Sequence, residues 1–290
     1  MGEIKELLLK IGAISEPDLV VFSEGTRDRD SLIVYRDRRS GVIFIDNFYV
    51  GHEEYEVGEH RDHLTKLIGI PDWERYNDTK RRTDAYKQFI VGKDIVDVGC
   101  GKGHFVENVQ YDTKSVLGVE IDSACRKNLY KKGINNSADL GHLSDDSIDT
   151  VFCFHVLEHL IDPLKILSEM RRVLRPGGVI IIEVPHARDF LLTTLGGDAY
   201  KLFALWSQHL ILHTRSSLER LITAAGFTAQ LTEGIQRYPL SNHLHWLQAQ
   251  KPGGHKSLLS CIDSPALARE YGAVLSKIDA TDTLVCIAEG

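Results

Sequence analysis

The stretch DIVDVGCGKGHF, residues 94–105, decides the fold. It begins with a short apolar run that is typical of a buried strand. Gly99, Gly101 and Gly103 follow, and Phe105 opens a segment with helical spacing. Glycines in such a strand-to-helix turn let the backbone approach a ligand without interference from a Cβ atom. The stretch therefore predicts the first strand, turn and helix of a ligand-binding α/β domain.

The rest of the chain continues this alternation. Further strands are expected at 116–122, 148–156, 179–185, 227–233 and 283–289, with helices at 125–133, 164–174 and 216–225. Short strands that alternate with helices form right-handed βαβ units, whose helices cover both faces of a parallel sheet. The predicted fold class is therefore a doubly wound, mostly parallel α/β sheet of the Rossmann-like kind.

Two acidic residues mark the ligand edge of this sheet. Asp97 lies in the first strand, and Glu120 ends the second, 120 − 103 = 17 residues after Gly103. A carboxylate at that place can accept hydrogen bonds from both hydroxyls of a ribose. Nucleotide-binding folds of several kinds share this feature, so it does not select the cofactor. A nicotinamide-binding GxGxxG would need glycine at position 104, which is His104.

Four motifs in order resemble those of class I S-adenosylmethionine-dependent methyltransferases. They are VDVGCGKGHF, NSADL, SIDTVFCFHVLEHL and LRPGGVIIIEVP, and the resemblance covers residues 92–235. It implies the class I methyltransferase fold with S-adenosylmethionine as cofactor. The implied contacts are Asp97 at the ammonium end of the methionine, Gly99, Gly101 and Gly103 along it, Glu120 at the ribose, Asp139 near the adenine amino group and His155 near the reactive methyl group.

His155 also raises the question of a metal. His155, Glu158 and His159 have i, i+3, i+4 spacing, so on a helix they would share one face and could bind a divalent ion. The same LEHL sequence occurs in members of the resembled family that bind no metal. We therefore expect no metal here.

Four other candidate histidines lie in two segments that are expected to cover the substrate, 186–214 and 237–275. His209 is the second candidate for a proton acceptor, and His213, four residues later, is expected to be a packing or surface residue unless it contacts substrate. His243 and His245 alternate in NHLHW and would point to one side if that sequence were extended.

The domain prediction divides the chain near residue 90. Residues 1–90 are expected to form an N-terminal appendage, with a helix at 3–12, a hairpin around 32–35 and 42–45, and a helix at 72–90. Residues 91–290 are expected to form the S-adenosylmethionine-binding domain with its two cover segments. No cysteine precedes Cys100, which excludes a zinc ribbon at the hairpin.

Composition limits the partners. With 34 Lys+Arg and 41 Asp+Glu the net charge is −7, which disfavours a nucleic-acid partner. No apolar stretch approaches the ~18 residues of a membrane span. The five scattered cysteines indicate reduced thiols and a cytoplasmic protein.

The expected activity follows from the resemblance. WSQHLILHTRSSLERLITAAGF, residues 206–227, is similar to sugar and small-molecule methyltransferases of bacterial polysaccharide clusters. We therefore expect O-methylation of a sugar or nucleotide-sugar-like molecule, with His155 or His209 as the base, since histidine suits proton transfer at neutral pH. The alternatives are N- or C-methylation of another metabolite, and a non-catalytic protein on the same fold. The oligomeric state stays open.

Overall fold

The computed structural model describes residues 2–51, 71–195 and 197–290. Its centre is a seven-stranded sheet in the order β10-β11-β8-β7-β4-β5-β6. The strands are β4 (Asp94–Val98), β5 (Ser115–Val119), β6 (Asn136–Ser137), β7 (Ile148–Phe154), β8 (Leu174–Pro185), β10 (Thr228–Ile235) and β11 (Thr283–Glu289). Strands β4 to β8 pair in parallel, and β11 runs antiparallel to both β8 and β10. This confirms the predicted doubly wound, mostly parallel fold.

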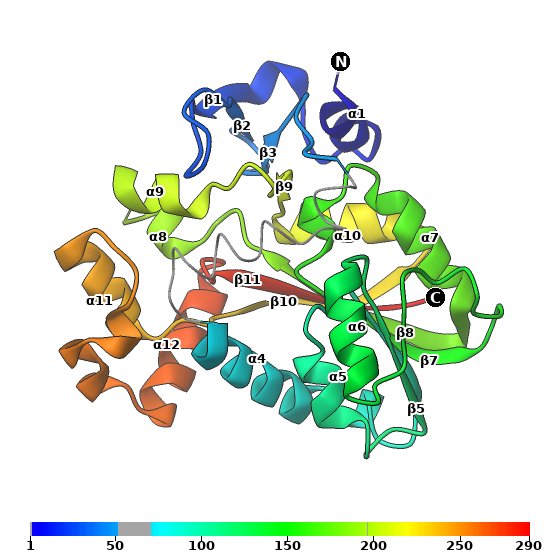
Figure 1. Ribbon diagram of the computed structural model, residues 1–290. Coiled ribbons are helices and arrows are strands. Elements are labelled where there is room, and N and C mark those ends of the chain that lie inside the picture. The colour runs from blue at the N-terminus through cyan, green and yellow to red at the C-terminus, as the bar shows by residue number, and fades with distance from the viewer. Residues whose placement is uncertain (1, 52–70, 196) are drawn as a thin grey trace.

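Helices cover both faces of the sheet (Figure 1). They are α4 (Pro71–Ala85), α5 (His104–Val109), α6 (Ser123–Lys131), α7 (Pro163–Val173), α10 (Arg215–Ala224) and α12 (Pro265–Lys277). Side chains of β8 alternate between the faces: Ile180 and Ile182 pack with Leu167 of α7 and Leu218 of α10, whereas Ile181 packs with Phe105 of α5. Within the described ranges, no helix has the length and apolarity to cross a bilayer.

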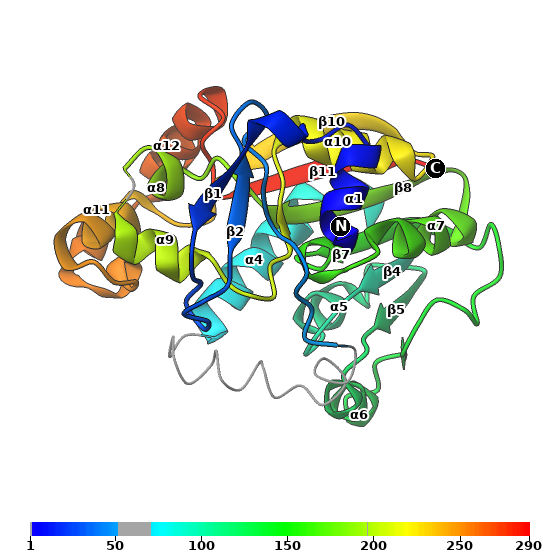
Figure 2. The same ribbon diagram turned by 90° about the horizontal axis from the view of Figure 1, so that it is seen from above.

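A second, smaller sheet lies above the first in Figure 1, with α1 (Glu3–Lys10) beside it. Its strands are β1 (Leu19–Ser23), β2 (Val34–Asp37), β3 (Ile43–Ile45) and β9 (Ile211–Leu212). The predicted hairpin is present as β2 and β3, which pair antiparallel. The fourth strand comes from the predicted cover segment 186–214, so that segment lies against the N-terminal residues (Figure 2). Residues 52–70 of the predicted appendage lie outside the described residues.

The remaining helices lie in the two predicted cover segments. They are α8 (Phe190–Thr193), α9 (Asp198–Ala204) and α11 (Leu240–Ala249). The extended reading of NHLHW was wrong, because this sequence lies inside α11. His243 and Trp246, three residues apart, are both buried on one face of that helix, against Tyr271 and Tyr200 respectively.

A buried ion-pair network attaches α4 to the main sheet. Glu183 in β8 is fully buried, and Arg81 donates to both of its carboxylate oxygens at 2.8 and 2.9 Å. Arg82 donates twice more to Oε2, and the Tyr86 hydroxyl donates to Oε1. Burial opposes the charge of Glu183, but Arg82 and Arg81 hold its pKa at about 2. The network therefore keeps a carboxylate ionised in the apolar centre of the sheet.

Substituting Glu183→Gln should destabilise the protein strongly, because it leaves two arginines without their buried counter-charge. We expect a loss of about 3–5 kcal/mol of unfolding free energy, the range for breaking one side of a buried pair. Glu107→Gln is the control, since Glu107 and its partner Lys132 are both exposed and such pairs contribute about 0–1 kcal/mol. Urea unfolding of both variants tests this, and equal losses would show that the network does not stabilise the fold.

Candidate active site

The glycine turn after β4 has the conformation that its sequence predicts. Gly99, Gly101 and Gly103 have φ of 75, 57 and 77°, a region that other residues rarely adopt. A Cβ atom at Gly99 would lie 2.2 Å from Val156 Cγ2, and one at Gly103 would lie 2.2 Å from Leu129 Cδ2. Two of the three glycines are thus required by the packing of the turn itself.

Glu120 lies immediately after β5, facing this turn. Its side chain is buried, and Oε2 accepts the Gly101 amide at 2.7 Å while Oε1 accepts the Asp122 amide at 2.9 Å. The structure thus brings the predicted ribose acceptor and the middle glycine together. Asp139 is exposed, follows β6, and its Oδ1 accepts the Gly141 amide.

Asp97 lies inside β4, at 3% exposure. Burial raises the pKa of Asp97 to about 7, although Arg82 opposes the shift. Glu120 and Glu183 add to the rise because their negative charges disfavour a third. Asp97 is therefore a carboxyl group that a nearby cation would ionise.

His155 and Glu158 form a hydrogen-bonded pair at the carboxyl end of β7. His155 Nδ1 lies 3.2 Å from Glu158 Oε1. Burial raises the pKa of the fully buried Glu158, but the hydrogen bond with His155 and the charges of His155, His159 and His209 together lower it to about 2. A carboxylate only accepts hydrogen bonds, so Nδ1 carries the proton of this bond. His155 Nε2 is buried and has no hydrogen-bond partner among the described residues. The arrangement leaves Nε2 as a proton acceptor that a carboxylate orients.

The expected grouping of His155, Glu158 and His159 on one helical face was wrong. His155 has a φ of 56° and precedes a three-residue 3₁₀ turn, Leu157–His159, so no helical face is formed. The residues that converge instead are Glu158, His159 and His209, whose potential ligand atoms lie within 4.8 Å of one another. The rings of His159 and His209 are 4.9 Å apart. This set could hold a metal ion.

The other candidate histidines lie elsewhere. His213 is fully buried, and its Nδ1 is 3.1 Å from the Ser217 hydroxyl. His243 packs in α11, with Nδ1 against the Tyr271 hydroxyl, and His245 is a partly exposed residue of the same helix. His209 and His213 therefore lie in different surroundings, since only His209 belongs to the Glu158 cluster. His243 and His245 also differ, since only His243 is buried.

Sequence reasoning missed how Glu158 links distant segments. Its main-chain oxygen accepts the Leu210 amide at 2.7 Å, which fixes His209 beside it. One signal was available: Glu158 stands in the apolar run VLEHL, where a charged residue needs a buried partner. That signal does not give the position of His209, fifty-one residues away, which follows from tertiary contact only.

The profile of a family described as a methyltransferase domain matches residues 72–232, more than half of the 290-residue chain. The chain belongs to this methyltransferase domain family. The match begins inside α4, upstream of the predicted boundary near residue 90, and that boundary stays a prediction.

Individual relatives agree with this assignment. A protein of Mycolicibacterium smegmatis, described as a probable S-adenosylmethionine-dependent methyltransferase, is 30% identical over 181 residues, 59% of this chain and 68% of the relative. A ubiquinone biosynthesis O-methyltransferase of Thiobacillus denitrificans is 25% identical over 52% of this chain and 72% of its own length. The fold resembles that of a solved S-adenosylmethionine-dependent methyltransferase from Archaeoglobus fulgidus, with a TM-score of 0.55 and 18% identity, covering 80% of this chain and all of that one. The protein is an S-adenosylmethionine-dependent methyltransferase.

Proposed function

We propose that this methyltransferase transfers a methyl group to a hydroxyl of a small molecule, with His155 as the proton acceptor. The observation that carries the proposal is the buried Nε2 of His155, which has no partner among the described residues while Nδ1 is held by ionised Glu158. A neutral amine attacks through its lone pair and loses its proton only after the N–C bond has formed, and an activated carbon is more acidic than an alkyl hydroxyl. An alkyl hydroxyl therefore gains most from an oriented base.

The reaction needs few groups. When bound, S-adenosylmethionine would supply the methyl group from its sulfonium: the S–CH₃ bond would break, with its electron pair going to sulfur, as the new O–C bond forms. His155 Nε2 takes the hydroxyl proton during this step, and Glu158 stabilises the imidazolium that results. The protein otherwise has to align the two reactants and exclude water.

The residues of the glycine turn suit this cofactor. We assign Asp97 to its positive methionine end, Gly99, Gly101 and Gly103 to the backbone surface along it, Glu120 to the ribose and Asp139 to the adenine side. Two buried carboxyl groups near one turn favour a cationic ligand with a diol, and neither would favour an added 2′-phosphate.

The acceptor class is tested by a panel. A sugar or nucleotide-sugar-like acceptor is the first candidate, and phenols are the second, because a relative is named a ubiquinone biosynthesis O-methyltransferase. We assign residues 186–214 and 237–275 as substrate cover. Mass spectrometry after incubation with sugar nucleotides, phenols, amines and activated carbons should show a methyl gain on a hydroxyl. A gain only on amines or carbon would contradict O-methylation.

Glu120→Ala should weaken binding of S-adenosylhomocysteine by about 1.5–3 kcal/mol, because it removes a charged acceptor of two ribose hydroxyls. Calorimetry measures the affinity. Asp122→Ala is the matched control: it removes the N-cap of α6 next to the same turn and should cost stability rather than affinity. Unchanged affinity in Glu120→Ala would contradict the ribose assignment.

Cofactor affinity should fall with pH below about 7. The pKa of Asp97 is raised to about 7, so the carboxyl group is mostly protonated at pH 6 and must lose its proton to meet a cation. We expect S-adenosylhomocysteine affinity to fall by about 15-fold in total between pH 7 and 5.5, with proton release on binding that rises from about one half towards one as the pH falls. Calorimetry in buffers of different ionisation enthalpy tests this. The same pH dependence in Asp97→Asn would assign the effect to another group.

His155→Gln should lower kcat by about 10²-fold or more, since proton removal is lost while alignment survives. Its affinity for S-adenosylhomocysteine should stay within a few-fold of the wild type. His209→Gln, tested in the same assay on the acceptor found above, is the comparison. If only His209→Gln loses activity, the base is His209.

A chelator separates proton transfer from metal binding. Glu158 Oε2 and His209 Nδ1 also have no hydrogen-bond partner among the described residues, which favours an ion as the alternative role of this cluster. Activity that disappears in EDTA and returns with one divalent cation would assign Glu158, His159 and His209 to that ion. Full activity in EDTA is the expected result.

A further inference from the structure

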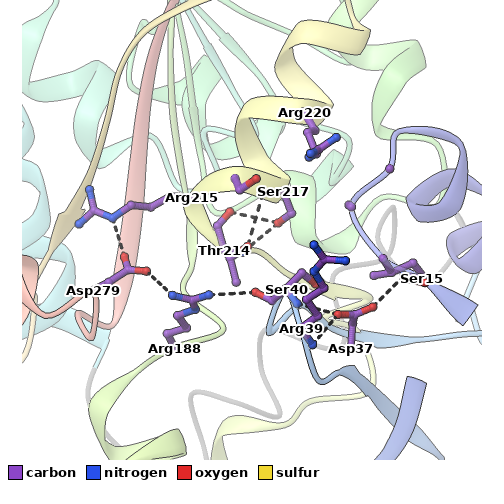
Figure 3. A pocket seen from close by; sticks show the side chains of 14 residues that line it. Ser15, Asp37, Arg39, Ser40, Arg188, Thr214, Arg215, Ser217, Arg220 and Asp279 are labelled. Atoms are coloured by element: carbon purple, nitrogen blue, oxygen red, sulfur yellow. Dashed lines mark hydrogen bonds and ion pairs between the residues drawn. The ribbon is translucent and has the colours of Figure 1, made fainter. Parts of the chain in front are cut away.

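A pocket of about 550 Å³ lies between the N-terminal segment and the start of α10. Four arginines and two aspartates are among the residues that line it: Arg39, Arg188, Arg215, Arg220, Asp37 and Asp279 (Figure 3). They come from the β2–β3 turn, the segment after β8, α10 and the segment after α12. The pocket contains none of the residues assigned above to the cofactor or to proton transfer, although Arg188 and Thr214 belong to the cover segment 186–214. Its formal charge is +2 in a chain whose net charge is −7.

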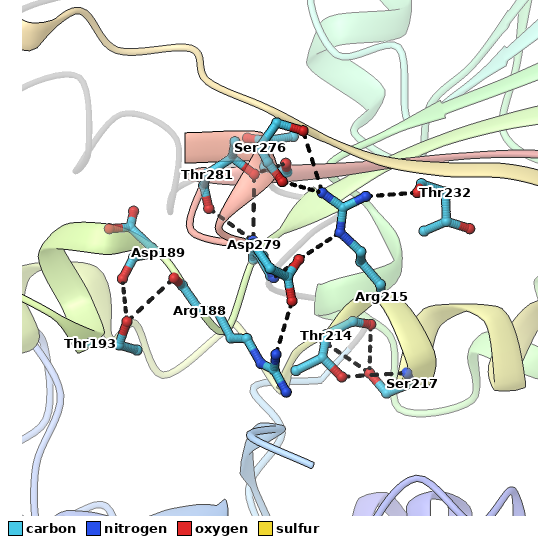
Figure 4. Close-up of polar contacts among 12 residues, drawn as sticks. Arg188, Asp189, Thr193, Thr214, Arg215, Ser217, Thr232, Ser276, Asp279 and Thr281 are labelled. Atoms are coloured by element: carbon cyan, nitrogen blue, oxygen red, sulfur yellow. Dashed lines mark hydrogen bonds and ion pairs between the residues drawn. The ribbon is translucent and has the colours of Figure 1, made fainter. Parts of the chain in front are cut away.

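Asp279 pairs with two of the arginines (Figure 4). Arg215 Nε donates to Asp279 Oδ1 at 2.5 Å, and Arg188 Nη1 donates to Oδ2 at 3.0 Å. Arg215 also donates to the main-chain oxygens of Thr232 and Ser276, and Arg188 donates to that of Ser40. These two guanidinium groups thus have structural partners.

Asp37 does not neutralise the other two arginines. Its Oδ1 accepts the amides of Arg39 and Ser40 at 2.9 and 2.6 Å, and its Oδ2 accepts the Ser15 amide at 2.7 Å. Both carboxylate oxygens therefore hold the main chain of the β2–β3 turn against the segment after α1. The Asp37 carboxylate therefore stabilises the backbone of the pocket wall.

Arg39 and Arg220 remain. In the part of the chain that the structure describes, neither guanidinium forms a hydrogen bond or ion pair, although both line the pocket. Arg220 Nη1 lies close to Gly12, where a Cβ atom would be 3.0 Å from it. A larger residue at Gly12 would thus press on this guanidinium.

The N-terminus of α10 adds to the positive potential. Thr214 is the N-cap of this ten-residue helix, and its side chain accepts the Ser217 amide. The first turn of the helix lines the pocket. The partial positive charge of a helix N-terminus favours anions. Two unneutralised guanidinium groups and a helix N-terminus hence face one cavity from different elements.

We propose that this pocket binds the phosphate group of a phosphorylated small molecule, away from the residues assigned to the cofactor and to proton transfer. Arginine presents a planar fork of donors that matches phosphate oxygens in pairs. The volume exceeds what one phosphate fills and lies within the range of pockets for small organic ligands. Arg39 and Arg220 supply the binding charge, and Arg188 and Arg215 hold the wall through Asp279.

The test measures binding of inorganic phosphate and pyrophosphate to the full chain by calorimetry, without turnover. Wild-type protein should bind pyrophosphate more tightly than phosphate, with an affinity that falls as salt rises. The double variant Arg39→Gln/Arg220→Gln should bind pyrophosphate at least about tenfold more weakly, since each charge-assisted hydrogen bond contributes that much or more.

The matched control is Arg38→Gln/Arg269→Gln, which removes the same charge from the same hairpin turn and from α12 but not from the pocket. It should keep wild-type pyrophosphate affinity. Both double variants should bind S-adenosylhomocysteine normally, which shows that they are folded. Three results would overturn the proposal: no pyrophosphate binding by the wild type, equal losses in both double variants, or citrate binding as tight as that of pyrophosphate.

Discussion

The buried carboxylate of Glu183 in β8 accepts hydrogen bonds from Arg81 and Arg82. Residues of the proposed proton-transfer pair and of the proposed cofactor site lie around this ion-pair network. The main-chain oxygen of Glu183 accepts the His155 amide at 2.8 Å, which fixes the residue at the carboxyl end of β7. Arg82, held by the same carboxylate, lies over the Phe154 ring and opposes the rise in the pKa of Asp97. The main chain of Glu183 therefore contacts the proposed proton acceptor, and its side chain holds the arginine that lowers the pKa of Asp97.

Glu158 plays a comparable part at the boundary between the two sheets. Its side chain orients His155, and its main-chain oxygen receives the Leu210 amide. The next residues, Ile211–Leu212, form β9 and pair with β3 of the N-terminal sheet. The N-terminal strands are thus connected to the Glu158 cluster through one hydrogen bond and one short strand.

Local patterns predicted the parts of the fold that local forces determine. The glycine turn after residue 98 and the alternating strands depend on nearby residues, and both are present as expected. The extended conformation considered for NHLHW rested on histidines that repeat with period two. The sequence is instead helical, and its buried pair, His243 and Trp246, has the spacing of a helix. The meeting of Glu158 with His209 depends on the pairing of β9 with β3, a tertiary contact that no sequence window contains.

The two charged regions lie on different strands of the main sheet. Glu120 follows β5 and Asp97 lies in β4, whereas Arg188 of the arginine-lined pocket follows β8, which is three strands from β5 and two from β4. With strands about 4.8 Å apart, the offset across the sheet is roughly 10–14 Å. Because Asp97 and Glu120 are buried, salt screens their interactions less than it screens those between exposed charges. Two segments connect the regions: residues 209–217 run from the Glu158 cluster through β9 to the pocket wall, and β8 with the residues that follow it runs from Glu183, which accepts the His155 amide, to Arg188 of the same wall.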